Sequence, residues 1–331
     1  MSTKSDLLKI LSDNDGEYVS GEKIGEILGV SRTAVSKACA SLRKDGYEIE
    51  SKTNRGYLLA RHGNTLLEDG ISAFVKVPCS IKVYDVTGST NEVAKTVDLD
   101  ECKAEDGTPL PVVIIADKQT AGKGRLGRKF ESPAGTGLYM SFVFRPEFDI
   151  SRSLFVTMAS AVGTCRAIES AAGKHAEIKW VNDLFYNGKK ICGILTEAQS
   201  DCETGTIDRL ITGIGVNCFP GSFPPDVAHI AGSLAGKTAD FSRERLAAEM
   251  INEILPLITK PDVASFMDEY RERCFILGST IKIHPQYNDY GIRAKALAVD
   301  EYGGLVVRYL EGEKTGTEET LRTGEISISI D

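Results

Sequence analysis

The segment AGKGRLGRKF, residues 121–130, interleaves glycines with basic side chains in a pattern that suits the binding of an anion. Glycines let backbone N–H groups approach an anion closely, and lysine and arginine side chains neutralise its charge. A charge-assisted hydrogen bond contributes about 1.5–3 kcal/mol, so a few such contacts hold a phosphate firmly. The segment therefore predicts a phosphate-binding loop whose cations are Lys123, Arg125, Arg128 and Lys129.

Two standard phosphate-binding motifs do not fit this loop. The glycines spell G-x-G-x-x-G, but a dinucleotide-binding loop opens a helix at the third glycine, and the proline- and glycine-rich segment 129–137 excludes one. A P-loop requires Lys followed by Ser or Thr where Arg128 and Lys129 stand. A flexible basic linker is disfavoured because apolar stretches at 112–117 and 138–144 predict a core strand on each side.

Two further stretches carry polar groups beside apolar ones. GSTNEVAK (88–95) places Glu92 three residues after Ser89, a spacing that is also that of a helix capping box. The apolar run LITGIGVN (210–217) predicts a buried strand that contains glycines.

The segment IKWVNDLFYNGKKICGILTE (178–197) predicts a hairpin, because Asn187–Gly188 is the signature of a type I′ turn. An ordinary hairpin with Trp180 in the core is the alternative interpretation. The concentration of polar groups favours a functional one. These polar groups are Lys179, Asn182, Asp183 and Lys190.

The composition limits the class of protein. The chain has 331 residues, 42% hydrophobic residues and a net charge of −8, which is enough apolar material for two or three domains. No apolar run reaches the ~18 residues of a membrane span, and the first residues lack the pattern of a signal peptide, so we expect no membrane partner. The 8 cysteines form no C-x-x-C and the 4 histidines are scattered, which argues against a zinc site or a disulfide framework. Free thiols such as Cys39 and Cys165 suit the core of a cytoplasmic protein.

The first sixty residues predict a winged helix-turn-helix. Helical periodicity with Ser and Gly boundaries favours short helices at 6–11, 20–29 and 31–45, and YEIES (47–51) and YLL (57–59) form a hairpin around a polar turn. Residues 1–30 carry 3 Lys against 6 acids, whereas residues 31–61 carry 7 Lys or Arg against 3. A solvated three-helix interaction module is the alternative, but the basic charge on the third helix and the wing favours DNA binding. The predicted DNA-binding residues are Ser31, Arg32, Thr33, Ser36, Lys37, Arg43, Lys52 and Arg55.

In combination these motifs resemble one family, the biotin protein ligases, and in particular its bifunctional members that also repress biotin genes. The resemblance rests on the GSTN stretch, the G-K-G-R-x-G-R loop after Gln119, the K-W-x-N-D hairpin that ends in K-x-x-G-I-L, and the G-I-G-V-N strand. Each motif alone is weak evidence for the family. All of them in this order behind a winged helix are specific.

The resemblance implies an α+β fold with three domains. These are a winged helix-turn-helix over residues 1–62, a mixed-sheet catalytic domain similar to class II synthetases over 63–274, and an SH3-like β-barrel over 275–331. The alternation of apolar and polar residues in STIKIHP, YGIRAKALAVDEYGGLVVRYL and GEISISI is consistent with the short strands of such a barrel.

The family activates biotin with ATP as biotinyl-5′-adenylate and transfers it to a lysine of a carboxylase carrier protein. Cations must offset the repulsion between the carboxylate and the triphosphate, and this implies catalytic roles for Lys190 and Arg125. Mg²⁺ is expected with ATP, and no residue is assigned as a metal ligand. The implied biotin-binding residues are Ser89, Thr90, Asn91, Gln119, Gly122, Lys123, Gly124, Arg125, Lys190 and Gly193. The implied ATP- or adenylate-binding residues are Arg125, Arg128, Phe130, Lys179, Asn182, Asp183, Lys190 and Asn217.

Three positions depart from the family pattern. Lys123 replaces the first arginine of the loop and loses the planar guanidinium fork. Val181 replaces the usual proline of K-W-P-N-D, which is expected to loosen that turn. Phe130 stands where many members have tryptophan, which weakens any stacking on adenine. None of the three removes a group that the chemistry requires.

The resemblance also implies partners: the biotin carboxyl carrier protein of acetyl-CoA carboxylase or a related carboxylase, operator DNA, and a second copy of the chain in a homodimer. Two alternatives stay open at this point. One is a biotin-sensing repressor without catalytic activity. The other is a lipoate- or octanoyl-transferring ligase on the same fold, although such proteins normally lack a winged helix.

Overall fold

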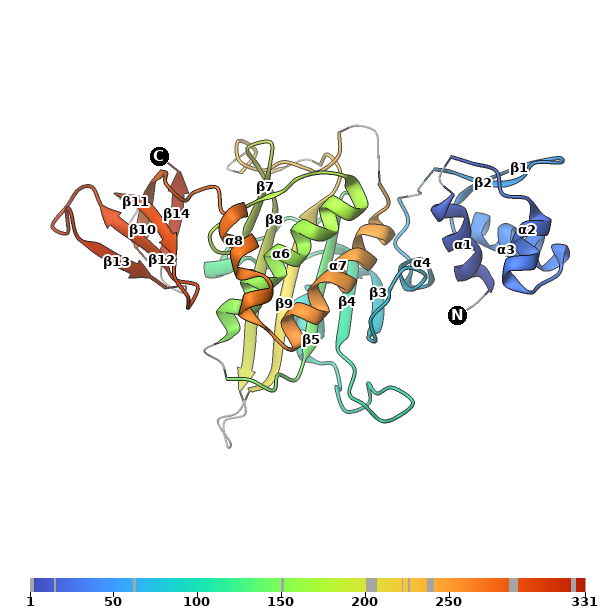
Figure 1. Cartoon of the computed structure of the whole chain (residues 1–331), viewed down its shortest axis with the longest axis horizontal. Helices are drawn as coiled ribbons and strands as arrows, with labels where there is room; N and C mark the ends of the chain where they lie inside the picture. Colours follow the sequence, from blue (N-terminus) through green and yellow to red (C-terminus); the bar gives the residue numbers. More distant parts are fainter. Residues whose placement is uncertain are drawn as a thin grey trace.

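We describe a computed structural model of the chain, in which the elements follow one another as three units (Figure 1). The structure describes residues 3–14, 16–61, 64–149, 152–200, 207–221, 223–225, 227–236, 241–285, 291–322 and 326–330. The predicted boundary between the first two domains, at residues 62 and 63, lies outside the described residues.

The N-terminal unit is a winged helix-turn-helix. Its elements are α1 Thr3–Asp13, α2 Gly21–Leu28, α3 Arg32–Lys44, β1 Glu48–Lys52 and β2 Gly56–Arg61. The predicted caps are confirmed: the Ser20 and Ser31 hydroxyls accept hydrogen bonds from the amides of Lys23 and Ala34, and Gly29 closes α2 in the left-handed region (φ 63°). The predicted apolar face of α3 is buried, so the opposite face of this helix is left to solvent.

The central unit is built on a seven-stranded mixed sheet with the order β3-β4-β5-β9-β8-β7-β6. Its strands are β3 Ser80–Thr87, β4 Val112–Gln119, β5 Gly137–Phe144, β6 Glu177–Lys179, β7 Asp183–Tyr186, β8 Lys189–Ser200 and β9 Ile207–Asn217. Its helical segments are α4 Glu68–Ser72, α5 Thr90–Lys95, η1 Arg125–Gly127, α6 Ser153–Ala172, α7 Arg243–Thr259, η3 Val263–Ser265 and α8 Met267–Arg273. Only β3 and β4 pair in parallel among the described strands.

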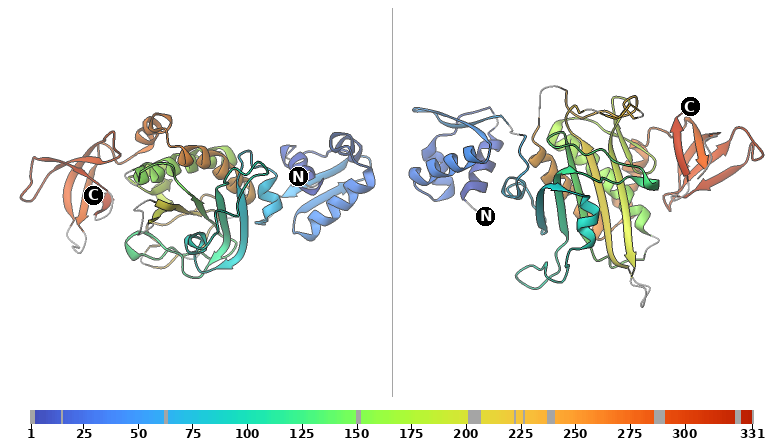
Figure 2. Two further views of the ribbon diagram at one scale, coloured as in Figure 1. Left: turned by 90° about the horizontal axis from the view of Figure 1, so that it is seen from below. Right: turned by 180° about the vertical axis from the view of Figure 1, so that it is seen from behind.

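The two faces of the sheet have different covers. Helices α6 and α7 lie side by side across one face, whereas the short α5 lies on the opposite face (Figures 1 and 2). Strand β4 shows how the sequence allows this. Val113 and Ile115 belong to the large core beneath the long helices, and Val112 and Ile114 pack with α5. A strand that is covered on both faces is continuously apolar, which is why VVIIA does not alternate.

The C-terminal unit is a five-stranded antiparallel sheet with the order β13-β12-β11-β10-β14. Its strands are β10 Thr280–Pro285, β11 Ile292–Val299, β12 Leu305–Tyr309, β13 Glu318–Leu321 and β14 Ile326–Ile330. The predicted strands are confirmed, but the edge strands β13 and β14 do not pair with each other within the described residues. The closed SH3-like barrel therefore stays a prediction.

Two tertiary contacts fix the ends of the central unit. Glu244 at the start of α7 is almost fully buried, and its carboxylate accepts hydrogen bonds from the Tyr47 hydroxyl (2.7 Å) and the Leu67 amide (2.9 Å). At the other end, the Trp180 indole N–H donates to the Gly303 carbonyl of the C-terminal unit (3.0 Å). Each neighbouring unit is thus held to the central one through a buried polar group.

The described residues contain no helix of the length and apolar character that crossing a lipid bilayer demands. Their cysteines are all free thiols, and the predicted core residues Cys39 and Cys165 are fully buried.

The buried carboxyl of Glu244 predicts a pH-dependent stability. Burial raises the pKa of Glu244 above its ordinary value, so the folded protein binds this proton more tightly than the unfolded chain does. That contribution is complete below the unfolded pKa and is lost as the pH rises through the folded pKa. Glutamine keeps an oxygen for Leu67 and an N–H for Tyr47 but does not titrate. We therefore expect the melting temperature of wild type, relative to Glu244→Gln, to fall as the pH is raised above the ordinary glutamate pKa of 4.5.

The same measurement on Glu253→Gln, at a more exposed position of α7, is the control for the charge change. A difference between wild type and Glu244→Gln that stays constant across this pH range would contradict the prediction.

Candidate active site

A cavity of about 320 Å³ lies against the face of the central sheet that α5 covers, beneath the glycine-basic loop. Nearly all of the predicted ligand-binding residues line it, although they come from segments far apart in the sequence. The lining residues among them are Ser89, Thr90, Asn91, Gln119, Lys123, Gly124, Arg125, Arg128, Phe130, Lys179, Asn182, Asp183, Lys190, Gly193 and Asn217. Gly122 is buried behind the wall, where a Cβ atom would lie 2.4 Å from the Phe130 carbonyl oxygen.

The loop itself is a closed, hydrogen-bonded structure. The Gly124 amide donates to the Arg128 carbonyl (2.7 Å), and the Phe130 amide donates to the Gly122 carbonyl (3.0 Å). Leu126 at the tip is half exposed and adopts the left-handed region (φ 56°), a conformation that is uncommon outside glycine. The loop therefore projects its basic side chains from a defined backbone, and the flexible-linker alternative is wrong.

The inner end of the cavity is a network of uncharged polar groups. The Gln119 side-chain oxygen accepts from both the amide (2.8 Å) and the hydroxyl (3.1 Å) of Thr90. The fully buried Ser141 hydroxyl lies 2.6 Å from the side-chain oxygen of Asn91 and 2.7 Å from the Thr90 hydroxyl. Ser89 is the N-cap of α5 but its side chain accepts no capping hydrogen bond, so the alternative interpretation of this stretch as a capping box is not supported. Glu92 pairs with Lys95 and Lys123 instead. This end is suited to a neutral ligand with hydrogen-bonding groups.

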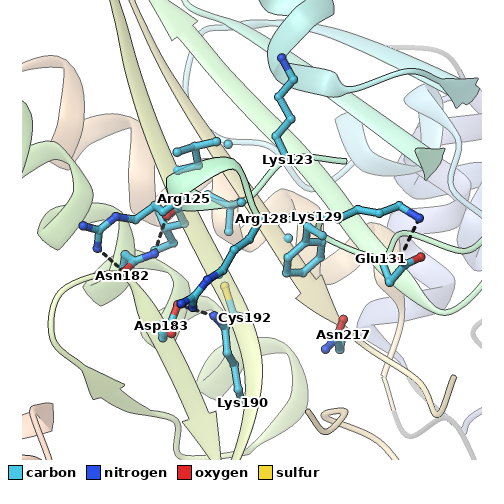
Figure 3. A pocket seen from close by; sticks show the side chains of 18 of the residues that line it. Lys123, Arg125, Arg128, Lys129, Glu131, Asn182, Asp183, Lys190, Cys192 and Asn217 are labelled. Atoms are coloured by element: carbon cyan, nitrogen blue, oxygen red, sulfur yellow. Dashed lines mark hydrogen bonds and ion pairs between the residues drawn. The ribbon is translucent and has the colours of Figure 1, made fainter. Parts of the chain in front are cut away.

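The outer end gathers cations around one carboxylate. The Lys190 ammonium pairs with Asp183 at 2.6 Å, and Figure 3 shows Arg128 extending toward the same carboxylate. Arg125 donates to the side-chain oxygen of Asn182 (2.9 Å), and the side-chain N–H of Asn182 donates to the Ile194 carbonyl (2.8 Å). The hairpin that carries Asn182 and Asp183 thus holds the loop from below.

The charges at this end do not balance. Burial, followed by the positive charges of Lys190 and Arg128, lowers the pKa of Lys179, and Asp183 opposes the shift. Burial also lowers the pKa of Arg125, and the charge of Arg128 adds to the effect. An excess of cations over carboxylates costs free energy that an anionic ligand recovers. The geometry therefore suits an anion at the outer end and a neutral polar group at the inner end.

The glycines of the G-I-G-V-N strand make room for these side chains. A Cβ atom at Gly213 would lie 2.2 Å from the side-chain oxygen of Asn91, and one at Gly215 would lie 2.5 Å from the Phe130 ring. Phe130 is fixed further by an edge-on contact with Tyr139, with ring centroids 6.4 Å apart. Val181, at the position expected to loosen the hairpin, is buried, and its carbonyl accepts a hydrogen bond from the Tyr270 hydroxyl (3.1 Å).

Sequence reasoning missed part of the cavity wall. Phe223, Val227, Ile230 and Ala231 line the outer end from an irregular segment between β9 and α7. The segment is held by the backbone of Lys190, whose amide donates to the Ile230 carbonyl and whose carbonyl accepts from the Gly232 amide, both at 2.9 Å. An aperiodic segment gives no signal of its role in the sequence. Ser141 was missed because a buried serine in a strand resembles any small core residue.

Comparison with known proteins places the chain in a family. Residues 84–217 match the model of the biotin/lipoate A/B protein ligase family, and residues 3–58 match a helix-turn-helix domain. The bifunctional ligase/repressor BirA of Bacillus subtilis is 33% identical over 94% of this chain and 95% of its own length. The chain belongs to the bifunctional biotin ligase/repressor family.

More distant relatives agree with this assignment. BirA of Escherichia coli is 28% identical over 95% of this chain and 94% of its own length. A biotin protein ligase from Aquifex aeolicus, solved with biotin and ATP, is similar with a TM-score of 0.59 and 25% identity, over 76% of this chain and 99% of its own.

The predicted DNA-binding residues of this family member are all exposed on α3 and the wing. Several of them have partners within the protein. Arg32 pairs with Glu22 at 2.6 Å, the Arg43 side chain donates to the Ile49 carbonyl (2.8 Å), and the Lys52 ammonium lies 4.9 Å from the Tyr18 ring centroid. Arg43 therefore also ties α3 to the wing.

The close approach of the Phe130 ring to Gly215 predicts that a side chain at position 215 destabilises the protein. Gly215→Ala forces the ring to move, and we expect a loss of about 1–3 kcal/mol in the free energy of unfolding. Gly193, its neighbour across the ladder, is the matched control because a Cβ atom there meets the same ring at an ordinary 3.5 Å. Denaturant unfolding measures both variants. Equal losses for the two alanines would mean that the Phe130 ring has room to move.

Proposed function

We propose that the protein activates biotin with ATP as biotinyl-5′-adenylate, transfers biotin to a lysine of a carboxylase carrier protein, and represses biotin genes as a DNA-binding protein. One observation carries the proposal. The cavity joins an uncharged polar end at Thr90 and Gln119 to a cationic end at Lys190 and Arg125. Biotin has the matching pattern, with a neutral ureido ring at one end and a carboxylate at the other.

In the first step, an oxygen of the biotin carboxylate attacks the α-phosphorus of ATP and pyrophosphate leaves. Two anions must meet, so fixed cations lower the barrier. Lys190 is assigned to the carboxylate and the phosphate oxygens, and Arg125 to the phosphates, which makes these two the catalytic residues. Asp183, 2.6 Å from the Lys190 ammonium, holds that ammonium in place.

In the second step, a neutral lysine amine of the carrier attacks the acyl carbon, and AMP leaves with the C–O bond electrons. The adenylate is reactive toward water, so it must be covered until the carrier arrives. The loop 122–130 lies over the cavity, and Arg125 and Arg128 extend from it toward the phosphate end (Figure 3). We assign to this loop the role of shielding the adenylate from water.

The residues divide between the two substrates by their place in the cavity. Ser89, Thr90, Asn91 and Gln119 are proposed to bind the ureido and thiophane end of biotin. The loop residues Gly122, Lys123 and Gly124 and the strand residue Gly193 are proposed to follow its chain. The residues proposed for ATP and the adenylate are Arg125, Arg128, Phe130, Lys179, Asn182, Asp183, Lys190 and Asn217.

Mg²⁺ is proposed to enter with ATP. Among the described residues no group of three His, Cys, Asp or Glu side chains is placed to hold a metal by itself. Asp183 and the side-chain oxygen of Asn182 are the oxygen donors beside the phosphate end, and Mg²⁺ bound there would neutralise phosphate charge. The carrier partner is proposed to be the biotin carboxyl carrier protein of acetyl-CoA carboxylase or a related carboxylase, and the location to be the cytoplasm.

The domain division is also part of the proposal. Residues 1–62 form the operator-binding winged helix, residues 63–274 the catalytic domain, and residues 275–331 an SH3-like domain. Biotinyl-5′-adenylate is proposed as the co-repressor that favours a homodimer, so that two winged helices bind two half-sites of one operator. The α3 and wing residues from Ser31 to Arg55 assigned above make the DNA contacts.

The ligase activity is tested by incubating the full chain with biotin, MgATP and a biotin carboxyl carrier domain. We expect the mass of one biotin on one carrier lysine, because the cavity matches both ends of biotin. Mass spectrometry of the carrier is the measurement, and a carrier with that lysine changed to arginine is the control.

Parallel reactions with lipoate separate the alternatives. Faster transfer of lipoate than of biotin would identify a lipoate ligase. Biotin-dependent DNA binding without ATP–pyrophosphate exchange would identify a repressor that lacks catalysis.

The repressor role predicts that adenylate raises DNA affinity. Biotin plus ATP is expected to favour the dimer and to strengthen binding to a palindromic site upstream of biotin genes, and by reciprocity DNA strengthens adenylate binding. Lys37→Ala is expected to weaken binding to every sequence and to reduce the slope of log affinity against log salt by about one. Sedimentation and DNA titration with and without biotin plus ATP are the measurements. Identical values in both states would leave a ligase that senses no biotin.

A further inference from the structure

Glu92, on the exposed side of α5, joins the glycine-basic loop to the polar end of the cavity. Its carboxylate forms an ion pair with the Lys123 ammonium of the loop at 2.6 Å and another with the Lys95 ammonium of its own helix at 2.8 Å. Both lysines lower the pKa of Glu92, so the carboxylate is charged at neutral pH. Figure 3 shows Lys123 pointing away from the cluster of Arg125, Arg128 and Lys190, toward this helix.

Further polar contacts connect this ion pair with the inner end of the cavity. Lys95 also pairs with Glu197 on β8 at 2.9 Å, and the other oxygen of Glu197 accepts a hydrogen bond from the Asn91 side chain at 2.7 Å. Asn91 is in contact with the buried Ser141, which is also in contact with Thr90. A chain of charged and polar contacts thus runs from the loop to the residues assigned to the biotin ring.

The loop is consequently held at two places on opposite sides. On one side Arg125 is bonded to Asn182 of the hairpin. On the other side Lys123 is bonded to Glu92 of α5. The first contact engages a side chain that the reaction needs for phosphate, whereas the second leaves the phosphate-binding groups untouched.

We propose that Glu92 is a positioning residue, which anchors the loop 122–130 to α5 through Lys123 so that the loop stays closed over the adenylate. This inference rests on the proposed function, since it concerns retention of the intermediate. It assigns to Lys123 a structural partner in addition to its expected contact with biotin. A single ammonium is sufficient to pair with one carboxylate, so lysine serves at this position without the planar fork of an arginine.

The test compares Glu92→Gln with Asp100→Asn in the full chain. Asp100 is the matched control because its carboxylate also pairs with an exposed cation, Arg145 at 3.1 Å, but is not joined to the loop. Each protein is loaded with isotope-labelled biotin and MgATP, freed of excess substrate, and followed for the loss of bound adenylate. Since exposed ion pairs contribute little individually, we expect escape from Glu92→Gln to be about two- to fivefold faster than from wild type or Asp100→Asn.

Two further measurements separate anchoring from a general structural effect. Lys123→Met combined with Glu92→Gln should release adenylate no faster than Lys123→Met alone, because both changes remove one interaction. At 1 M salt, where the screening length is about 3 Å, wild type should approach the rate of Glu92→Gln. The melting temperatures of Glu92→Gln and Asp100→Asn should agree.

Trypsin provides a readout that does not depend on the reaction. Cleavage after Arg125 or Arg128 in the protein alone should be about two- to fivefold faster in Glu92→Gln than in Asp100→Asn, because a released loop is a better substrate. If either the cleavage rate or the adenylate escape rate is the same in these two variants, the positioning role is rejected. A wild-type protein that forms no adenylate refutes the proposed function instead, and the cleavage rates alone then decide whether Glu92 anchors the loop.

Discussion

The structure of the site depends on one constraint: several cations must be held close together around the carboxylate of Asp183, while the other carboxylate that lines the cavity, Glu131, is paired with Lys129. Lys190 and Asp183 form the central pair, and the loop adds its arginines from above. Like charges at this spacing repel, and burial removes the water that would screen them, which is reflected in the lowered pKa of Lys179. The arrangement is possible because the cations come from elements that are fixed independently by hydrogen bonds and packing. An anionic ligand at this end would relieve the repulsion, and the free energy that the repulsion costs would then favour its binding.

The fixing elements are spread over the whole central unit. The hairpin β6–β7 is held from the far side, where Trp180 is bonded to the C-terminal unit and Tyr270 of α8 is bonded to the Val181 carbonyl. Strand β9 brings Gly213 and Gly215 to the wall so that Asn91 and Phe130 fit against the sheet. The C-terminal unit therefore contributes to the site without lining the cavity, through the backbone it supports.

The junction between the central unit and the winged helix is also held by buried polar side chains. Arg243, which is nearly fully buried, donates to Asp117 at the end of β4 and to the Asn64 carbonyl in the connection to the winged helix. Asp117 also accepts from the Gly135 amide, in the segment that follows the loop. The next residue, Glu244, accepts a hydrogen bond from the Tyr47 hydroxyl of the winged helix. The adjacent residues Arg243 and Glu244 thus link strand β4, the segment after the loop and the connection to the winged helix with the winged helix itself.

The sequence by itself determined the local elements and the chemical character of the site. Caps at Ser20 and Ser31, the turn at Asn187–Gly188 and the apolar run of β4 depend on interactions within a few residues, and the glycines and basic residues of segment 121–130 indicated an anion-binding loop. The neutral polar group beside the anion was implied only by the resemblance to the biotin protein ligases. Only the tertiary structure decided which side chains meet. The pairing of Glu92 with Lys123, the burial of Ser141 beneath Thr90 and the wall formed by Val227 and Ile230 join residues that no periodicity relates. Such contacts are set by how the strands and helices pack. Glu92 is an example, because its spacing from Ser89 also allowed a capping box, whereas in the fold its carboxylate pairs with Lys95 and Lys123.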